Sequence, residues 1–98
     1  MVILEINLVV KEGQNSELKR KFNESFGTAI IHQSGFYNAY LLEHFEDKKD
    51  CTIILFFDTE EKRIEWVNSD DHDPAWESIV ALLDSFSVKS YKIVDKVR

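Results

Sequence analysis

The sequence has few cysteines, few basic residues and no long apolar run, and each shortage excludes a class of protein. A single cysteine, Cys51, excludes an intramolecular disulfide and a zinc site built from cysteines. The 12 lysines and arginines are outnumbered by 18 aspartates and glutamates, and the formal charge of −6 disfavours nucleic acid and anionic lipid as partners. Beyond the N-terminus no apolar run is longer than Ile53–Phe57, and no basic residue precedes the first apolar stretch. We therefore expect neither a membrane span nor a signal peptide, and a cytoplasmic protein.

The composition is that of an ordinary globular domain. The 98 residues are 44% hydrophobic, 12% aromatic and 31% charged. A chain of this length buries roughly 60–65% of its unfolded surface, which gives a core without disulfides or metal. No linker, repeat or biased tract divides the chain, so we expect one domain over residues 1–98.

Apolar residues at alternate positions predict four strands. The expected ranges are Val2–Val10, Phe36–Phe45, Cys51–Phe57 and Phe86 to about Val97. The two middle strands are separated by a short polar connection and should form a hairpin. The third expected strand is apolar on both faces, which is unusual for a sheet with one face in water.

Apolar residues at helical spacing predict the helices between these strands. A first helix should begin with Asn15 or Ser16 as its N-cap and end near Gly35. A second should begin within residues 58–61. Pro74 suits the first turn of a further helical piece, so Asp73 is expected as its N-cap and Asp84 as its end.

The resulting order is β-α-β-β-α-β, which predicts a ferredoxin-like α+β fold with a four-stranded antiparallel sheet. Two helices cover only one face of such a sheet. Because the third strand is apolar on both faces, we expect a second copy of the chain to cover the other face. The sequence therefore predicts a homodimer with its sheets packed together.

Two features of the sequence resemble the antibiotic biosynthesis monooxygenase superfamily of dimeric α/β barrels. One is Asn7 on the first strand, and the other is the run from Trp66 to Trp76, with its W-x-x-S-x-x-H pattern ending at His72. The resemblance implies a pocket between sheet and helices. Some relatives are cofactor-independent oxygenases that convert phenolic polycycles to quinones, others cleave haem, and others have no firm activity.

The resemblance favours a cofactor-independent monooxygenase that forms a quinone from a small aromatic or phenolic substrate. His72 would be the general base, Asn7 a polar anchor and Trp66 an aromatic wall. Each has another interpretation: Asn7 as a structural hydrogen-bonder, Trp66 as an exposed or dimer-facing indole, and His72 as an imidazole whose charge the sequence does not fix. The alternative function is a non-catalytic dimer that binds a small aromatic ligand or acts in stress response.

Four further residues are candidates for substrate contact: Tyr40, His44, Phe57 and Trp76. Trp76 also lies on an apolar helical stripe, where core packing explains it. Trp76 stands where haem-cleaving relatives have their ligating histidine, so haem is disfavoured and no cofactor is expected. Asp70, Asp71 and Asp73 beside His72 suit a helix start better than a metal cluster, and no metal is expected.

Overall fold

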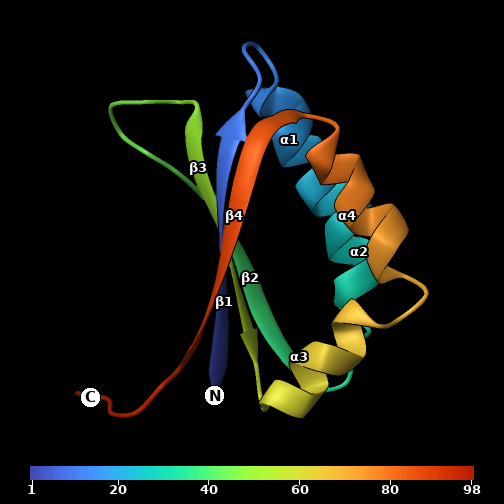
Figure 1. Cartoon of the computed structure of the whole chain (residues 1–98), viewed down its shortest axis with the longest axis vertical. Coiled ribbons are helices and arrows are strands. Elements are labelled where there is room, and N and C mark those ends of the chain that lie inside the picture. The colour runs from blue at the N-terminus through green and yellow to red at the C-terminus, as the bar shows by residue number, and fades with distance from the viewer.

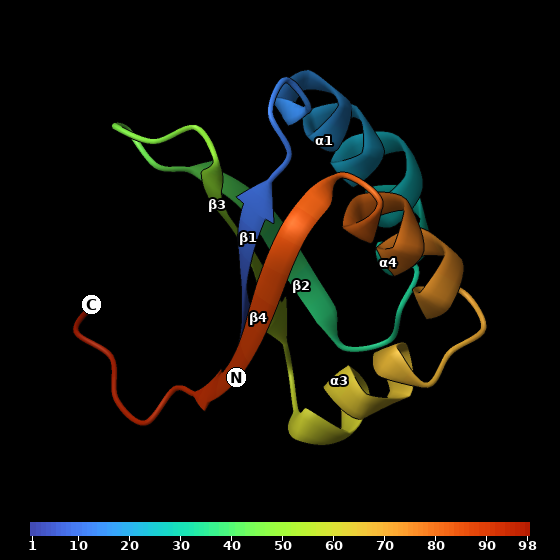
Figure 2. The same cartoon turned by 45° about the horizontal axis from the view of Figure 1, so that its top comes forward.

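The computed structural model describes the whole chain and shows an antiparallel sheet with every helix on one of its faces (Figures 1 and 2). The strands are β1 (Val2–Val10), β2 (Phe36–Glu43), β3 (Asp50–Phe57) and β4 (Leu83–Lys92). Their order across the four-stranded sheet is β2-β3-β1-β4. The ferredoxin-like fold expected from the sequence is confirmed.

The last strand differs most from its expected range. It begins at Leu83 because this side chain is buried and pairs with Val10 at the end of β1. It ends at Lys92, which pairs with Val2 at the start of β1, and the Ile93 amide donates to the carbonyl of Met1 (3.0 Å). Residues 93–98 therefore leave the sheet and extend away from it (Figure 1).

The first helical segment contains a turn of π-helix. It consists of α1 (Asn15–Lys21), the π-helical turn η1 (Phe22–Phe26) and α2 (Gly27–Ile30). The amide of Gly27 donates to the carbonyl of Phe22, five residues earlier. A Cβ on Gly27 would stand only 3.0 Å from that carbonyl oxygen, so glycine suits this close approach.

The start of α1 also differs from the expected capping. Asn15 is the first helical residue, and no side chain caps the helix. The side-chain amide of Asn15 (Nδ2) instead donates to the carbonyl of Lys48 (2.7 Å) and to the carboxylate of Glu43 (3.1 Å). Asn15 therefore ties α1 to the connection between β2 and β3.

The remaining helices are α3 (Glu60–Val67) and α4 (His72–Val80). Thr59 caps α3, and its side chain accepts from the amide of Lys62 (3.2 Å). The expectation that Asp73 caps α4 is wrong, because α4 begins at His72 and Asp73 lies in its first turn. Pro74 is tolerated there because the first turn of a helix needs no amide donors.

The hydrophobic core lies between the sheet and the helices. Its most deeply buried members are Leu8, Val10, Ile53, Leu55, Phe57, Trp66 and Ile79. Alternate residues of β1 and β3 point to this side and their neighbours to the other, as a pleated strand requires. None of the helices is long and apolar enough to cross a membrane.

No helix covers the opposite face of the sheet (Figure 2). This face, which we call the open face, carries the side chains of Ile3, Ile54 and Phe56 from the two central strands. Tyr40 of β2 packs edge-on against Phe56 with ring centroids 6.0 Å apart. Its ring is half exposed, so an apolar part of the open face meets solvent in a single protomer.

Candidate functional site

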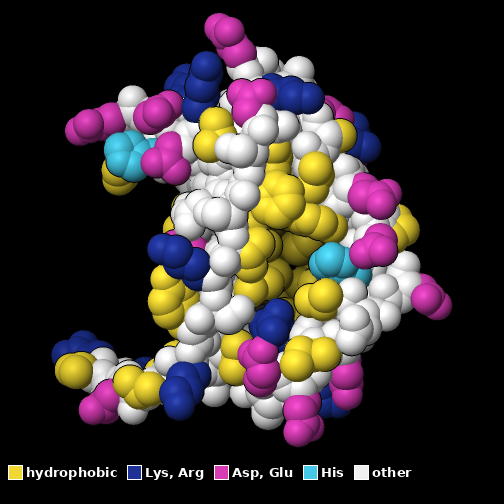
Figure 3. All heavy atoms as spheres, in the orientation of Figure 1, with side chains coloured by type: hydrophobic (Ala, Val, Ile, Leu, Met, Phe, Trp, Pro, Cys, Tyr) yellow, Lys and Arg dark blue, Asp and Glu magenta, His cyan; other side chains and the backbone are white.

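A cavity of about 240 Å³, which we call the Trp66 cavity, lies between the sheet and the α3 and α4 helices. Its lining comes from six elements and consists of Leu4, Ile6, Leu55, Val88, Phe26, Arg63, Trp66, Val67, His72 and Trp76. Apolar side chains gather in a hollow between β4 and the helices, and the hollow opens toward the viewer in Figure 3.

Trp66 forms the inner aromatic wall of this cavity. Its side chain is 1% exposed, which excludes the interpretation of an exposed indole. Phe26 of η1 meets it edge-on with ring centroids 5.8 Å apart, and His72 meets it edge-on at 5.1 Å. The indole is therefore held between the π-helical turn and the first residue of α4.

His72 is the imidazole of the cavity. Its Nδ1 lies 3.0 Å from Oδ1 of Asp73, and its side chain is 18% exposed while that of Asp73 is 81% exposed. When Nδ1 carries the proton that this carboxylate accepts, Nε2 holds a lone pair. Nε2 has no hydrogen-bond partner in the protein, so it can accept a proton from a ligand in the cavity.

Trp76 lines the cavity from α4 and contacts Phe86 of β4. Their rings meet edge-on with centroids 5.1 Å apart, and Trp76 is partly buried. Trp76 therefore lines the cavity and also packs against the core.

Arg63 is a cavity residue that the sequence reasoning missed. Its Nε donates to both oxygens of Glu60 (3.0 Å each), and its Nη2 donates to Oε1 of the same carboxylate. These hydrogen bonds raise the pKa of Arg63 and lower the pKa of Glu60. The signal available was spacing, because Arg63 lies three residues before Trp66 and thus on the same side of α3.

Asn7 does not reach the Trp66 cavity. It lies on the open face, where its amide donates to Oε1 of Glu5 (3.1 Å) and its oxygen accepts from the hydroxyl of Thr52 (3.0 Å). Its chain neighbours Ile6 and Leu8 point to the helices, so the strand pleat turns Asn7 the other way. The expectation that Asn7 shares a pocket with Trp66 and His72 is corrected, and its contacts are those of a structural hydrogen-bonder.

Three other expected contact residues also lie outside the Trp66 cavity. Tyr40 is on the open face. His44 follows β2, is exposed, and its Nδ1 accepts from the amide of Glu46 (3.1 Å). Phe57 is fully buried and packs edge-on against Phe36 with centroids 5.6 Å apart. Of the residues expected at the site, the structure brings together His72, Trp66 and Trp76.

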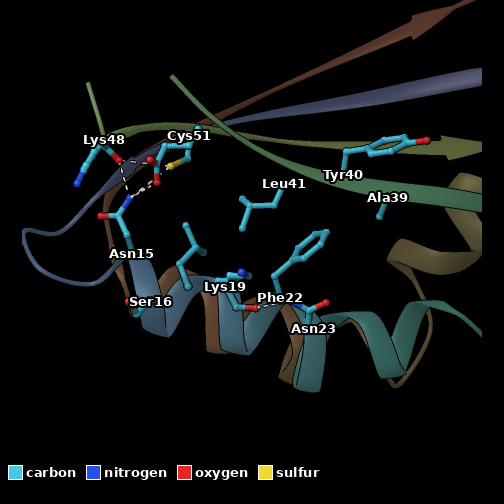
Figure 4. A pocket seen from close by; sticks show the side chains of 12 residues that line it. Asn15, Ser16, Lys19, Phe22, Asn23, Ala39, Tyr40, Leu41, Lys48 and Cys51 are labelled. Atoms are coloured by element: carbon cyan, nitrogen blue, oxygen red, sulfur yellow. Dashed lines mark hydrogen bonds between the residues drawn. The ribbon is translucent and has the colours of Figure 1, made fainter. Parts of the chain in front are cut away.

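A second cavity of about 570 Å³ lies between α1, η1 and the hairpin of β2 and β3 (Figure 4). On its floor the thiol of Cys51 donates to the carbonyl of Lys48 (3.4 Å). Burial, followed by the neighbouring carboxylates of Glu43, Asp50 and Asp47, raises the pKa of Cys51. A raised pKa disfavours the thiolate, which is the nucleophilic form of cysteine. The Trp66 cavity, which contains an imidazole, is therefore the stronger candidate site.

No group of three or more histidine, cysteine, aspartate and glutamate side chains is placed to hold a metal ion. Asp70 and Asp71, both exposed, make no side-chain hydrogen bond, and Asp73 contacts only the His72 ring. The acidic residues around His72 therefore form no common cluster.

No protein-family model and no curated protein matches the sequence. Solved structures do match the fold. SnoaB, a cofactor-independent oxygenase from Streptomyces nogalater, superposes with a TM-score of 0.88 at 14% identity, over 98% of this chain and 95% of that chain. A protein from Deinococcus radiodurans provisionally assigned as an antibiotic biosynthesis monooxygenase superposes with a TM-score of 0.84 at 13% identity, over 100% and 97% of the two chains. The chain therefore has the fold of the antibiotic biosynthesis monooxygenases.

Proposed function

We propose that this chain is a cofactor-independent monooxygenase of the antibiotic biosynthesis monooxygenase superfamily, and that it oxidises a small hydroxylated aromatic to a quinone in the Trp66 cavity. One observation carries the proposal: a single imidazole, oriented by Asp73, opens onto an apolar cavity walled by Trp66 and Trp76. The fold shared with SnoaB, a cofactor-independent oxygenase, supports it.

The reaction begins with proton removal by His72. Nε2 takes a proton from an activated methylene or phenol of the substrate, and Asp73 stabilises the imidazolium through Nδ1. The electron pair of the broken bond stays on the substrate as a carbanion or phenolate. The two indoles hold the aromatic plane and exclude water from this anion.

The anion itself supplies the electrons for oxygen activation. One electron passes to O2, the substrate radical and superoxide combine, and the new peroxide loses water as the quinone carbonyl forms. A methylene thus loses two hydrogens and gains one oxygen atom, while the second oxygen atom leaves as water. The substrate provides all four electrons, so the step needs no flavin, nicotinamide or metal.

Haem does not fit the residues of this cavity. The volume of about 240 Å³ suits a small aromatic better than a macrocycle. Trp76 cannot ligate iron. The one imidazole present, His72, is held by Asp73 against the edge of the Trp66 ring.

A homodimer is the assembly that we propose for this enzyme. The open face exposes the apolar side chains of Ile3, Ile54 and Phe56 beside the half-exposed ring of Tyr40. A second copy that packs its own open face on this surface would bury the same residues twice, as a two-fold axis requires.

The alternative is a dimer that binds a small aromatic ligand without turnover. The position of Asn7 favours it, because the expected polar anchor lies on the other face of the sheet and leaves His72 as the sole acid–base group of the cavity. Both functions need the aromatic walls, but only the oxygenase needs Nε2 of His72.

Oxygen uptake with anthrone as substrate separates the two functions. Uptake should proceed without added cofactor and survive chelation. His72→Ala should lower the rate by roughly 10²–10⁴, the usual contribution of a positioned base. His44→Ala removes an exposed histidine outside the cavity and should leave the rate unchanged.

An unchanged rate in His72→Ala would refute the base assignment. Anthrone that binds at the Trp66 cavity but consumes no oxygen would replace the oxygenase with the ligand-binding function.

A further inference from the structure

Arg63 brings a guanidinium to the Trp66 cavity. It lies on α3 three residues before Trp66, and residues at this spacing share a side of a helix. Its side chain is 19% exposed and lines a cavity whose other walls are almost entirely apolar. A cation in such surroundings interacts with a nearby anion more strongly than it would in water.

Only some of the N–H donors of the Arg63 guanidinium make hydrogen bonds in the protein. Glu60 takes hydrogen bonds from Nε and Nη2, and its own side chain is 50% exposed on the solvent side. Nη1 makes no hydrogen bond in the protein. Glu60 therefore uses the Nε–Nη2 edge and leaves both N–H groups of Nη1 and the second N–H group of Nη2 free to donate. An anionic oxygen of a ligand in the cavity can accept from them.

The cavity contains no carboxylate to oppose this charge. Arg63 and His72 are the only ionisable residues of its lining. Asp73, the partner of His72, is 81% exposed and reaches the ring from solvent. In a chain with a formal charge of −6, this cavity therefore presents groups that carry positive charge or none.

We infer that Arg63 binds the oxygen anion of the substrate through Nη1, so that the cavity selects hydroxylated aromatics that bind as phenolates or enolates. The inference rests on the proposed function and names its substrate class. In the first step a C–H or O–H bond breaks, the proton goes to Nε2 of His72, and the electron pair is delocalised onto the oxygen that Arg63 contacts. Arg63 thus stabilises the anion that His72 creates.

A coloured phenol tests this without turnover. We choose 2-hydroxyanthraquinone, because its phenolate absorbs at longer wavelength, and measure the bound phenolate fraction one pH unit below its ionisation in water. The wild-type protein should raise that fraction above the value in solution. Arg63→Gln should weaken phenolate binding by about 10- to 100-fold, the usual effect of losing one charge-assisted hydrogen bond.

Two further variants distinguish anion binding from a structural ion pair. Glu60→Gln leaves the guanidinium but removes its competing anion, so the phenolate fraction should be kept or increased. Arg20→Gln breaks the matching pair with Glu17 on α1, away from the cavity, and should change nothing. If Arg63→Gln and Glu60→Gln lose phenolate binding alike, the ion pair is structural and the inference is overturned.

A probe that does not bind would also overturn it. Oxygen uptake is measured separately: an active oxygenase indifferent to Arg63→Gln overturns this inference alone, whereas Arg63-dependent phenolate binding without oxygen uptake overturns the oxidation alone.

Discussion

Two adjacent residues of β3 test the proposed dimer, because they point to opposite faces of the sheet. Leu55 is 0% exposed and packs beneath the helices, whereas Ile54 lies on the open face. A lysine at Leu55 should prevent folding, since it places an unpaired charge in the core. A lysine at Ile54 should leave the protomer folded and abolish the dimer.

The size of the Ile54→Lys effect follows from the symmetry of the interface. An unpaired buried charge costs about 3–5 kcal/mol. In a two-fold dimer each copy carries the substitution, so the dimer loses about 6–10 kcal/mol while the free protomer, in which position 54 meets solvent, loses little. That loss corresponds to a weakening of the dimer by a factor of roughly 10⁴–10⁷.

Sedimentation velocity at micromolar concentration measures the assembly, and circular dichroism measures the fold. The wild type should sediment at twice the 11.5 kDa mass of the chain, and Ile54→Lys as a folded monomer. A wild type that stays monomeric would refute the reasoning, as would an Ile54→Lys variant that remains dimeric.

Two other predictions follow from residues outside the Trp66 cavity. Asn7→Ala should lower the free energy of unfolding by about 1–3 kcal/mol in urea titrations, because it removes the acceptor of the Thr52 hydroxyl, yet leave oxygen uptake within a few-fold of wild type. A large loss of activity at unchanged stability would show that Asn7 acts at the site. The raised pKa of Cys51 means that the unfolded chain loses its thiol proton first as pH rises above 9.0. The free energy of unfolding should therefore fall with rising pH in that range. Cys51→Ala should remove this part of the decline, and an identical pH dependence in the two proteins would contradict the assignment.

Strand periodicity was enough to predict the sheet, but not every element boundary. The range of β1 is as expected, because Val2–Val10 alternates with a polar turn after it. The end of β4 could not be predicted from the pattern, since the residues after Lys92 keep apolar side chains but do not pair with β1. The π-helical turn was hidden as well, because Phe22–Phe26 has the composition of an ordinary helix and tertiary packing decides its geometry.

Only the part of the candidate site that belongs to a sequence motif could be predicted. The W-x-x-S-x-x-H run identified Trp66 and His72, which meet in the structure. Asn7 was misplaced because its role came from the family resemblance and not from the strand pattern. The alternation itself puts Asn7 beside Glu5, on the face opposite the apolar one that packs under the helices. Arg63 was missed because a glutamate three residues before an arginine is typical of a solvent-exposed ion pair.

Because of the π-helical turn, the position of the cavity wall depends on the number of residues between Phe22 and Gly27, and not only on which residues they are. The hydrogen bond from Gly27 to Phe22 spans one residue more than an α-helical bond does. Removal of a single residue between them would restore regular helix and rotate the two sides of the turn against each other by about 100°. Phe26 would then leave the edge of Trp66, although every residue type at the cavity was still present. Single deletions along this turn would therefore expose a dependence that no scan of substitutions reveals.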